Sequence, residues 1–574
     1  MNNYFKLKNI VNYSSTMLNP KYIFVSGGVI SGLGKGVTAA ALGVLLKSRG
    51  YKVTAIKCET YLKIDSGTIN PIEHGDPFLC SDGLEADMDL GTYERFLDIE
   101  IGKKNFVTMG QIYQEIIDKE RSMGYNGKTV DAIPEIPNKI IERIKKAAEG
   151  NDICIVELGG TAGEYQNVYN YEAARMMKLE LPEDVIHVHI TYVPVPEHLG
   201  EPKTKPTQLS MRFLNMAGIQ PDFLVLRSNS EIDILRMDKV SNQCNIHKDR
   251  IILNANLRTI YELPEKFEEQ EFDRKALELL GLPVKRLQFE KWNQLINVIK
   301  TERKKRVTIG IAGKYIATGS FKLPDSYNSL THSLKHASWG TDIGVDIKFV
   351  NVEDIEKNGT SNYFDDVDGI IVPIGWGNRG AEGKIKAVEY ARKNNIPYLG
   401  LCFGMQLACV EYARNVAGIK DATSEEFDSN AKNKIIHSIP FDPKYQTIKG
   451  EGTSMRLGTF DCVVKKDTLA YNIYKKYGYG VEDSDGNLIV QERHRHRFEF
   501  NNDFRKQLSN RGLVFSGVSP DDFFVEMIEL KEKDHPFFLA TQAHPEYKST
   551  PLEPHPFFLE FVKKSLEYKS KKNK

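Results

Sequence analysis

The sequence has no net charge, no CxxC motif and no long apolar run, and each absence excludes a class of protein. Lys and Arg number 77, as do Asp and Glu. Balanced charge removes the attraction that draws basic proteins to nucleic acid or anionic membranes, so neither partner is expected. No apolar run reaches the ~18 residues of a membrane span. The seven scattered cysteines disfavour a zinc site or disulfide framework and indicate a reducing, cytoplasmic compartment.

The length of the chain argues against a single hydrophobic core. At 574 residues, two large domains or roughly three to four smaller ones are expected. An apolar share of 41% is enough to build such cores. The first twenty residues lack acidic residues, which leaves a transit peptide open, but they also lack arginine and a signal-peptide core. We therefore expect a disordered extension at 1–20, or a start at Met17.

Apolar runs rich in β-branched residues recur along both halves, with helical segments between them. Examples are YIFVSGG, ICIVELGG and VIHVHITYV in the first half, and VTIGIAGK, GIIVPIG and FFLATQA in the second. Such continuous runs are typical of strands buried on both faces of a parallel sheet. The predicted fold class is α/β, with two domains that each contain a mostly parallel sheet flanked by helices. The expected boundaries are 21–288 and 307–568, with a polar helix or linker at 289–306 and a basic tail at 569–574.

A glycine-rich segment, SGGVISGLGKGVT, lies between the first predicted strand and a predicted helix. Its backbone N–H groups, the helix N-terminus and Lys35 can converge on a phosphate. The strict P-loop pattern is not met, because Val29 stands where its first glycine belongs and Gly36 follows the lysine. Taken alone, the segment could be an ordinary tight turn.

Carboxylates and lysines elsewhere in the first half strengthen the nucleotide interpretation. The segment DGLEADMDLGTYERF carries several acidic residues, and Glu157 ends a predicted buried strand. Carboxylate oxygens near a phosphate loop are the ligands that Mg²⁺ requires, and parallel strands bind ligands at their carboxyl ends. GEPKTKPTQLS offers two lysines and hydroxyl groups to a second anion. A solvated acidic face and a surface loop are the alternatives for the first and last of these segments.

The first half of the chain resembles the synthetase domain of CTP synthases, a P-loop-like domain. The resemblance lies in the order and spacing of five segments: GGVISGLGKG, the HGD segment at His74, DGLEADMDLGTYERF, VELGGTAGE and GEPKTKPTQ. The resemblance implies ATP binding by Gly32, Leu33, Gly34, Lys35, Gly36, Val37, Lys57 and Asp89. It implies UTP or CTP binding by Ser31, at the start of the ATP turn, and by Glu164, Gln166, Lys203, Thr204, Lys205, Pro206, Thr207, Gln208 and Lys239. The implied Mg²⁺ ligands are Asp89 and Glu157.

A cysteine in the second half occupies a predicted strand-to-helix turn. Gly400, Cys402 and Gly404 form a G-x-C-x-G pattern, which is typical of a nucleophile elbow. A cysteine nucleophile needs a base and a group that orients the base. His544 and Glu546, at the end of another apolar strand, can supply both. Without this His-x-Glu pair, a buried structural cysteine would be the favoured interpretation.

The glycine-rich PIGWGNRG segment follows the strand GIIV, and its N–H groups can stabilise an oxyanion. This segment, the elbow and HPE together resemble the class I glutamine amidotransferase domain. Ile374 departs from the usual Gly-Gly pair of that family. The run QERHRHRFEF could alone indicate a nucleic-acid patch or a metal cluster, but it matches an RHRHR segment of CTP synthases. The resemblance implies that glutamine is bound by Gly375, Phe403, Gly404, Met405, Gln406, Glu426 and Arg497.

The two resemblances together imply ATP-dependent amination of UTP to CTP, with ammonia from glutamine and a phosphorylated UTP intermediate. They further imply GTP as an allosteric activator, CTP as a product inhibitor and a homotetramer. Two alternatives remain open: another glutamine-dependent ATP amidoligase, and a non-catalytic, filament-forming relative. One segment departs from the family, since GGTVGDIES is usual and GGTAGEYQN is present. Gln166 replaces a glutamate there, and we expect weaker inhibition by CTP because an amide discriminates less between cytosine and uracil.

Overall fold

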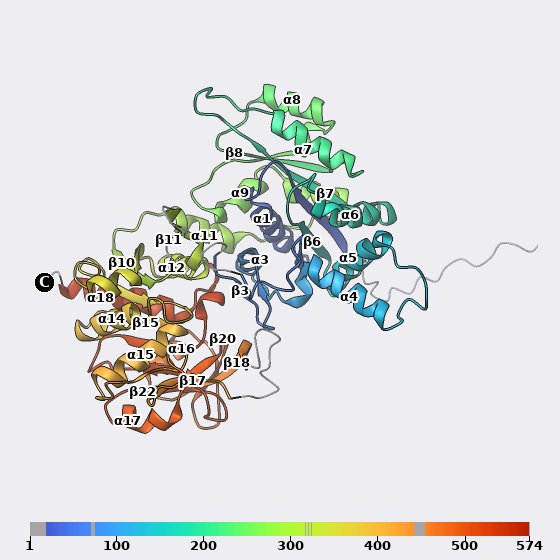
Figure 1. The fold of residues 1–574 in the computed structure, drawn as a ribbon. Coiled ribbons are helices and arrows are strands. Elements are labelled where there is room, and N and C mark those ends of the chain that lie inside the picture. Colours follow the sequence, from blue (N-terminus) through green and yellow to red (C-terminus); the bar gives the residue numbers. More distant parts are fainter. Residues whose placement is uncertain are drawn as a thin grey trace, which may run out of the picture.

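The protein folds into two lobes, one from each half of the sequence (Figure 1). The computed structural model describes residues 19–69, 75–315, 317–318, 321–322, 324–440 and 454–572. Most of the predicted extension at 1–20 and His74 of the HGD segment lie outside this range. No helix within the described ranges is long and apolar enough to cross a membrane.

The first domain is built on a seven-stranded sheet in the order β5-β2-β6-β1-β7-β8-β9, in which every neighbouring pair is parallel. All the strands predicted in this half are present, and β5 is an additional short strand. The central strands are buried along nearly their whole length, which explains their continuous apolar runs. The strands are β1 (Lys21–Gly27), β2 (Val53–Glu59), β5 (Phe106–Thr108), β6 (Ile153–Leu158), β7 (Val185–Val193), β8 (Phe223–Ser228) and β9 (Ile251–Asn254).

Helices cover both faces of this sheet. One apolar core forms under α1, α3, α9, α10 and α11, and two others form under α4 to α8. The helices of the first face are α1 (Lys35–Ser48), α3 (Met88–Leu97), α9 (Leu263–Glu268), α10 (Phe272–Leu279) and α11 (Glu290–Lys300). Those of the second face are α4 (Met109–Arg121), α5 (Ala132–Ala148), α6 (Val168–Glu180), α7 (Lys205–Met216) and α8 (Ile234–Cys244).

The second domain contains a ten-stranded sheet in the order β13-β10-β14-β15-β24-β23-β22-β18-β20-β19. The first five strands are parallel and were all predicted. The other five pair antiparallel, and the apolar runs did not reveal them. The parallel strands are β10 (Arg306–Gly313), β13 (Gly344–Asn351), β14 (Gly369–Val372), β15 (Tyr398–Leu401) and β24 (Phe538–Thr541). The antiparallel strands are β18 (Arg456–Val464), β19 (Val481–Glu482), β20 (Leu488–His496), β22 (Val514–Val518) and β23 (Val525–Glu529).

Helices cover both faces of this sheet too, so the predicted α/β class is confirmed for both domains. One core includes α13 (Val352–Asn358), α14 (Ala381–Lys393), α15 (Phe403–Asn415) and α17 (Arg505–Ser509). The other includes α12 (Asn328–Thr341), α16 (Leu469–Lys476) and α18 (Pro556–Lys572). The predicted tail at 569–574 is, as far as Lys572, the end of α18. Short strands complete the domain: β11 (Ala317–Thr318), β12 (Phe321–Lys322), β16 (Thr423–Ser424), β17 (Lys434–Ser438) and β21 (Phe498–Phe500).

The segment between the domains, predicted as a polar helix or linker, is the packed helix α11. Trp292 of α11 is buried in the core of the first domain, and its indole N–H donates to the carbonyl of Tyr261 at 3.0 Å. The Tyr261 ring meets Trp339 of α12 edge-on, with ring centroids 5.2 Å apart. The aromatic cluster therefore joins the first domain, α11 and the second domain without a free linker.

A hairpin of the first domain, β3 (Phe78–Leu79) and β4 (Glu85–Ala86), packs against β18 of the second. A Cβ atom on Gly83 in its turn would lie 2.8 Å from the carbonyl oxygen of Leu457. The N–H of Thr459 also donates to the carbonyl of Ser81 at 2.8 Å, a backbone hydrogen bond between the domains. The hairpin thus places the acidic segment before α3 beside the second domain.

Candidate active sites

Cys402 lies between β15, near the middle of the second sheet, and the N-terminus of α15. Its backbone has φ 51° and ψ −101°, a strained conformation for a residue with a side chain. Both flanking glycines are required sterically. A Cβ on Gly400 would lie 2.8 Å from the Cβ of Ala540, and one on Gly404 would lie 2.0 Å from a backbone carbonyl of β14. The sharp turn predicted for a nucleophile elbow is therefore present.

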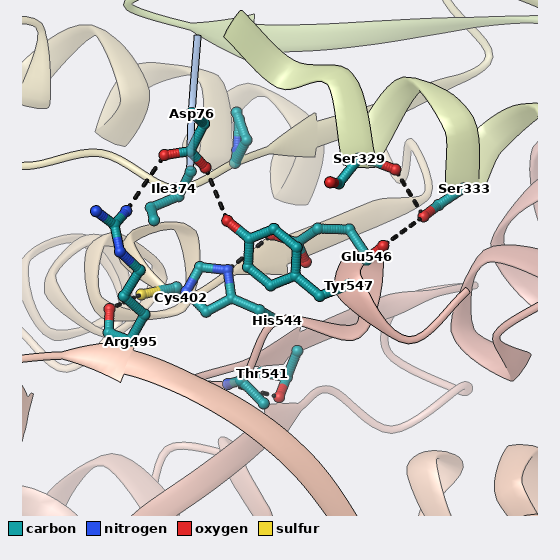
Figure 2. Close-up of polar contacts among 12 residues, drawn as sticks. Asp76, Ser329, Ser333, Ile374, Cys402, Arg495, Thr541, His544, Glu546 and Tyr547 are labelled. Atoms are coloured by element: carbon teal, nitrogen blue, oxygen red, sulfur yellow. Dashed lines mark hydrogen bonds and ion pairs between the residues drawn. The ribbon is translucent and has the colours of Figure 1, made fainter. Parts of the chain in front are cut away.

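His544 and Glu546 follow β24, the strand that pairs with β15. His544 Nδ1 and a Glu546 carboxylate oxygen are 2.7 Å apart, which fixes the orientation of the imidazole. The Nε2 atom of His544 has no hydrogen-bond partner among the described residues and lies on the side of the Cys402 sulfur (Figure 2). Ser333 of α12 donates to the backbone carbonyl of Glu546 at 3.1 Å and supports the turn. The structure thus brings the three predicted catalytic residues together.

The surroundings of His544 favour the imidazolium form. Burial opposes a charge on the ring, but the Glu546 carboxylate and the Cys402 side chain together raise the pKa of His544 to about 10. Gln542 donates its amide N–H toward the Cys402 sulfur at 3.5 Å. A cation and a hydrogen-bond donor therefore lie beside the sulfur, as suits a cysteine that acts as a nucleophile.

The predicted oxyanion loop is held by two buried lysines. Lys384 of α14 donates to the carbonyl oxygens of Pro373 and Ile374 at 2.6 and 3.0 Å. Because a trans peptide directs its C=O and N–H oppositely, this contact turns the N–H of Gly375 away from Lys384. Lys314 donates to the carbonyls of residues 376 and 377 in the same manner.

Two further contacts set the other end of this loop. The N–H of Gly377 donates to a Glu426 carboxylate oxygen at 2.6 Å. This is the direction expected when the preceding carbonyl is turned toward Lys314. Burial lowers the pKa of Lys384 well below its usual value, and its amine has no carboxylate contact within 4.0 Å among the described residues. Sequence reasoning missed Lys384, although a lysine at an apolar helix position, between Ala381 and Val388, was the available signal.

The other residues predicted to bind glutamine differ in their surroundings. Glu426 and Arg497 line a cavity of about 510 Å³ at the domain boundary, together with Lys314 and Trp376. The side chain of Gln406 instead donates to the carbonyl of Phe498 at 2.9 Å. Phe403 and Met405 are buried in the core, so only their backbone groups remain for a ligand, as with Gly404.

In the first domain, the predicted phosphate loop leads into α1. Gly32 and Gly34 have φ values of 74° and 84°, where glycine is favoured, and Ser31 is exposed. No side chain caps the N-terminus of α1 and no acidic residue lies in its first turn, so its N–H groups suit an anion. Lys35 donates to the carbonyl of Gly160 at 2.8 Å, which holds it beside the carboxyl end of β6.

The predicted Mg²⁺ ligands meet against the first turn of α1. A Cβ on Gly36 would lie 3.3 Å from a Glu157 carboxylate oxygen and 3.9 Å from the Cβ of Asp89. Lys57 forms ion pairs with Asp89 and, at 2.9 Å, with Glu59; the Lys57 ammonium lowers the pKa of Asp89 despite its burial.

Protein atoms at this place supply only part of the coordination shell of a Mg²⁺ ion. Within the described residues, no three His, Cys, Asp or Glu side chains form a metal-ligating group. Asp89 and Glu157 would therefore need phosphate or water oxygens to complete the shell, as is usual for Mg²⁺. The other acidic residues of the segment point elsewhere: Asp82 and Asp87 accept from residues 103 and 66.

Residues predicted to bind the pyrimidine nucleotide come from two segments beside the loop. The first turn of α7, with Thr204, Thr207 and Gln208 buried, lies next to it, since a Cβ on Gly28 would clash with Ser210 at 1.7 Å. Gly163 packs on Phe213 of α7 in the same way, at 2.9 Å. The lysines predicted for this site include Lys203, paired with Glu201, and the exposed Lys205 and Lys239; Pro206 lies in the first turn of α7.

The segment that departs from the family is held by its own side chains. Thr161 donates to one carboxylate oxygen of Glu164 at 2.6 Å, and Gln166 donates to the other at 3.1 Å. The Gln166 amide is thus directed toward the Glu164 carboxylate. Sequence reasoning also missed a cavity of about 430 Å³ at the carboxyl ends of β8 and β9. Its Asn254 contacts Thr38 of α1 at 3.4 Å, which places the cavity beside the phosphate loop.

The fold and these two sites define a glutamine amidotransferase domain joined to a nucleotide-dependent ligase domain. The family model "CTP synthase N-terminus" matches residues 21–282, and "Glutamine amidotransferase class-I" matches residues 322–564. CTP synthases from Carboxydothermus hydrogenoformans and Bacillus subtilis are 45% and 42% identical, over 95% and 96% of this chain and 99% and 100% of theirs. The chain belongs to the CTP synthase family, and it is a glutamine-hydrolysing ligase.

A relative from Thermococcus gammatolerans is 44% identical, over 96% of this chain and 99% of its own length. Among solved structures, the glutaminase domain of Trypanosoma brucei CTPS with bound acivicin is similar, with 35% identity and a TM-score of 0.40 over 46% of this chain and 94% of that one. The full-length identities establish membership of the family for both domains together.

Proposed function

We propose that this enzyme converts UTP, ATP and glutamine into CTP, ADP, phosphate and glutamate. The observation that carries the proposal is the presence in one chain of a Cys–His–Glu constellation and of a phosphate loop bordered by two carboxylates and a lysine. Glutamine hydrolysis supplies ammonia, and nucleotide chemistry activates the oxygen that ammonia replaces.

In the second domain, the Cys402 thiolate attacks the glutamine amide carbon. The negative charge that develops on the amide oxygen is stabilised by the N–H of Gly375. His544, protonated and held by Glu546, gives its proton to the departing nitrogen, so that ammonia leaves and a thioester remains. Water, deprotonated by the now neutral His544, then releases glutamate and restores the thiol. Glu426 and Arg497, in the cavity of about 510 Å³, are suited to the ammonium and carboxylate of glutamine.

In the first domain, the N–H groups before α1, Lys35 and Lys57 neutralise charge on the phosphates of ATP. A Mg²⁺ ion held by Asp89 and Glu157 would supply further charge stabilisation at the transferring phosphoryl oxygens. The γ-phosphoryl group moves to O4 of UTP, which converts a poor leaving group into phosphate. Ammonia then adds at C4 and phosphate leaves. The cavity of about 430 Å³ at Asn254 is suited to the nucleoside of ATP.

The pyrimidine nucleotide would contact the first turn of α7, the lysines at 203, 205 and 239, and the segment with Glu164 and Gln166. CTP at this segment would act as a product inhibitor, and GTP would act as an activator of glutamine hydrolysis. These assignments follow the family and are supported here by the adjacency of α7 and the phosphate loop. We also propose a cytoplasmic location, in keeping with the free, buried cysteines.

An oligomer, a homotetramer as in the family, is supported by apolar side chains on the surface of α7, of the first residue of α6 and of the turn that precedes α6. Tyr165 is 96% exposed and Met216 81% exposed, with Val168 and Phe213 nearby in the sequence at 49% and 38%. Large exposed apolar patches mark interaction surfaces. Light scattering after gel filtration should give four chains with ATP and UTP present, and Tyr165→Ser with Met216→Ser should reduce the mass.

The proposed function is tested by incubating the purified chain with ATP, Mg²⁺, UTP and ammonium chloride and separating the nucleotides. Formation of CTP with one ADP per CTP supports it. Another amidoligase would leave UTP unchanged while accepting a different carboxylate or carbonyl substrate, and a non-catalytic relative would consume no ATP. Either of those results would refute the proposal.

A further inference from the structure

The RHRHR run of β20 holds the catalytic groups of the second domain through its backbone. The N–H of His544 donates to the carbonyl oxygen of Arg493 at 2.8 Å. The thiol of Cys402 lies 3.8 Å from the carbonyl oxygen of Arg495. The backbone of two arginines, two residues apart, therefore positions the base and contacts the nucleophile.

The side chains of the same arginines cross to the first domain. Arg493 forms an ion pair with Glu94 at 2.9 Å and donates to the carbonyl of Leu79 at 2.8 Å. Arg495 pairs with Glu85 at 2.5 Å and with Asp76 at 3.2 Å (Figure 2 shows the second contact). Both arginines are nearly fully buried, at 3% and 5% exposure, and a buried ion pair is costly to break because one charge stays unpaired.

Alternation along the strand separates these roles. Successive side chains of a strand point to opposite faces, so His494 and His496 point away from the first domain. His494 lies 3.6 Å from Glu526, and His496 is within hydrogen-bond distance of the carbonyl of Phe498 at 2.9 Å. Among the residues that the structure describes, the run forms no metal-ligating group, and burial of Arg493 and Arg495 in ion pairs disfavours a nucleic-acid patch.

Two partners of the arginines, Glu85 and Glu94, flank the predicted metal ligand Asp89 in the sequence. Glu85 lies in β4 and Glu94 in α3, and Asp89 lies between them in the first turn of α3. A chain of direct contacts thus runs from Cys402 and His544, through β20, to the segment that carries Asp89. Tyr547, stacked on His544 with ring centroids 5.2 Å apart, adds a hydrogen bond to Asp76 at 2.9 Å.

We propose that Arg493 and Arg495 are positioning residues that couple glutamine hydrolysis to the state of the nucleotide site. Movement of the Asp89 segment on nucleotide binding displaces Glu85 and Glu94, and the arginines transmit this displacement to the backbone beside Cys402 and His544. Ammonia is then released only when the first domain can use it. The inference rests on the proposed function.

The test changes the acidic partners. Glu94 lies outside the cavity proposed for glutamine, whereas Glu85 is among the residues that line it, so Glu94→Gln is the decisive variant. Glu94→Gln and Glu85→Gln each keep the side-chain shape but remove the charge. In the full chain, we expect the stimulation of glutamate release by ATP and UTP to fall, and glutamate formed per CTP to rise about five-fold or more, in the range of typical coupling energies. Synthesis from ammonium chloride should stay within about two-fold of the wild type, a margin below that coupling range.

Asp346→Asn is the matched control, because it breaks an exposed arginine pair with Arg306, at 2.9 Å, far from β20 in the sheet order. A wild-type glutamate-to-CTP ratio in Glu94→Gln would overturn the inference. If a variant does not fold, ammonia-dependent synthesis is lost as well. Glu94→Asp, which keeps the charge and shortens the arm, then replaces it: a raised glutamate-to-CTP ratio supports the inference, and a wild-type ratio overturns it. Absence of CTP formation by the wild type would refute the proposed function instead.

Discussion

Replacing Lys384 by methionine should slow glutamine hydrolysis without destabilising the protein. The Lys384 amine donates two hydrogen bonds, at 2.6 and 3.0 Å, to the backbone carbonyl oxygens of Pro373 and Ile374. Each such bond contributes about 0.5–1.5 kcal/mol, so roughly 1–3 kcal/mol of bias holds the loop. That bias corresponds to about a 5- to 150-fold change in an equilibrium. Complete loss of one oxyanion donor, about 10²–10³ in kcat, is the upper bound.

The stability of the variant should move in the other direction. Burial lowers the pKa of Lys384 well below its usual value, so charging this amine costs more in the folded chain than in the unfolded one. This cost is absent above the unfolded pKa, grows as pH falls below it and reaches its full size below the folded pKa. Methionine has a similar volume and no charge. The Tm of Lys384→Met at neutral pH should therefore equal or exceed that of the wild type, while kcat falls and KM for glutamine changes little.

Two thiol reagents separate an oxyanion defect from a general disturbance. The aldehyde analogue of glutamine adds reversibly to Cys402 and forms an oxyanion, whereas iodoacetamide alkylates the same thiol without one. Lys384→Met should weaken aldehyde binding in proportion to the loss in kcat and leave the alkylation rate unchanged. Lys386→Met, on the exposed side of α14, is the control. Unchanged kcat and unchanged aldehyde affinity in Lys384→Met would refute the reasoning.

Three further predictions concern the remaining groups. Glu157→Ala, like Lys35→Ala, should abolish UTP-dependent ATP hydrolysis while basal glutaminase activity remains; a wild-type ATPase rate would remove that residue from the site. For Glu546→Gln, the sign follows from a folded pKa of His544 raised to about 10: the imidazolium persists below that pH and is lost above it. Without the carboxylate, the alkaline limb of the glutaminase pH profile should move to lower pH, and an unmoved limb would contradict this origin. Gln166→Glu should strengthen CTP inhibition about ten- to a hundred-fold, because a charge-assisted hydrogen bond contributes about 1.5–3 kcal/mol; equal inhibition of both proteins would show that this segment does not set feedback.

Sequence patterns predicted the parallel strands of both sheets, except the short β5, because these strands are buried on both faces and read as continuous apolar runs. The antiparallel strands of the second domain escaped, since β18 and β20 carry buried Arg, Glu and His side chains at core positions. Their charges are neutralised by pairing, as in Arg456 with Glu526 at 2.6 Å, and such pairing cannot be inferred from local composition.

The candidate site divides in the same way. Cys402 and His544 were accessible because each follows a recognisable strand, and the strands that carry them are neighbours in the sheet. The role of Arg493 could not be predicted from the sequence, because its partner Glu94 lies 399 residues away and only the domain arrangement brings the two together. Lys384 escaped because a buried amine bonded to backbone carbonyls has no sequence motif.

The division of labour between the domains is tested most directly by Cys402→Ala, assayed for CTP formation with glutamine and, separately, with ammonium chloride. The account predicts that the variant forms no CTP from glutamine and forms it from ammonium chloride at close to the wild-type rate. Synthesis from glutamine by a folded Cys402→Ala chain, or a failure of ammonium chloride to restore synthesis, would contradict the account.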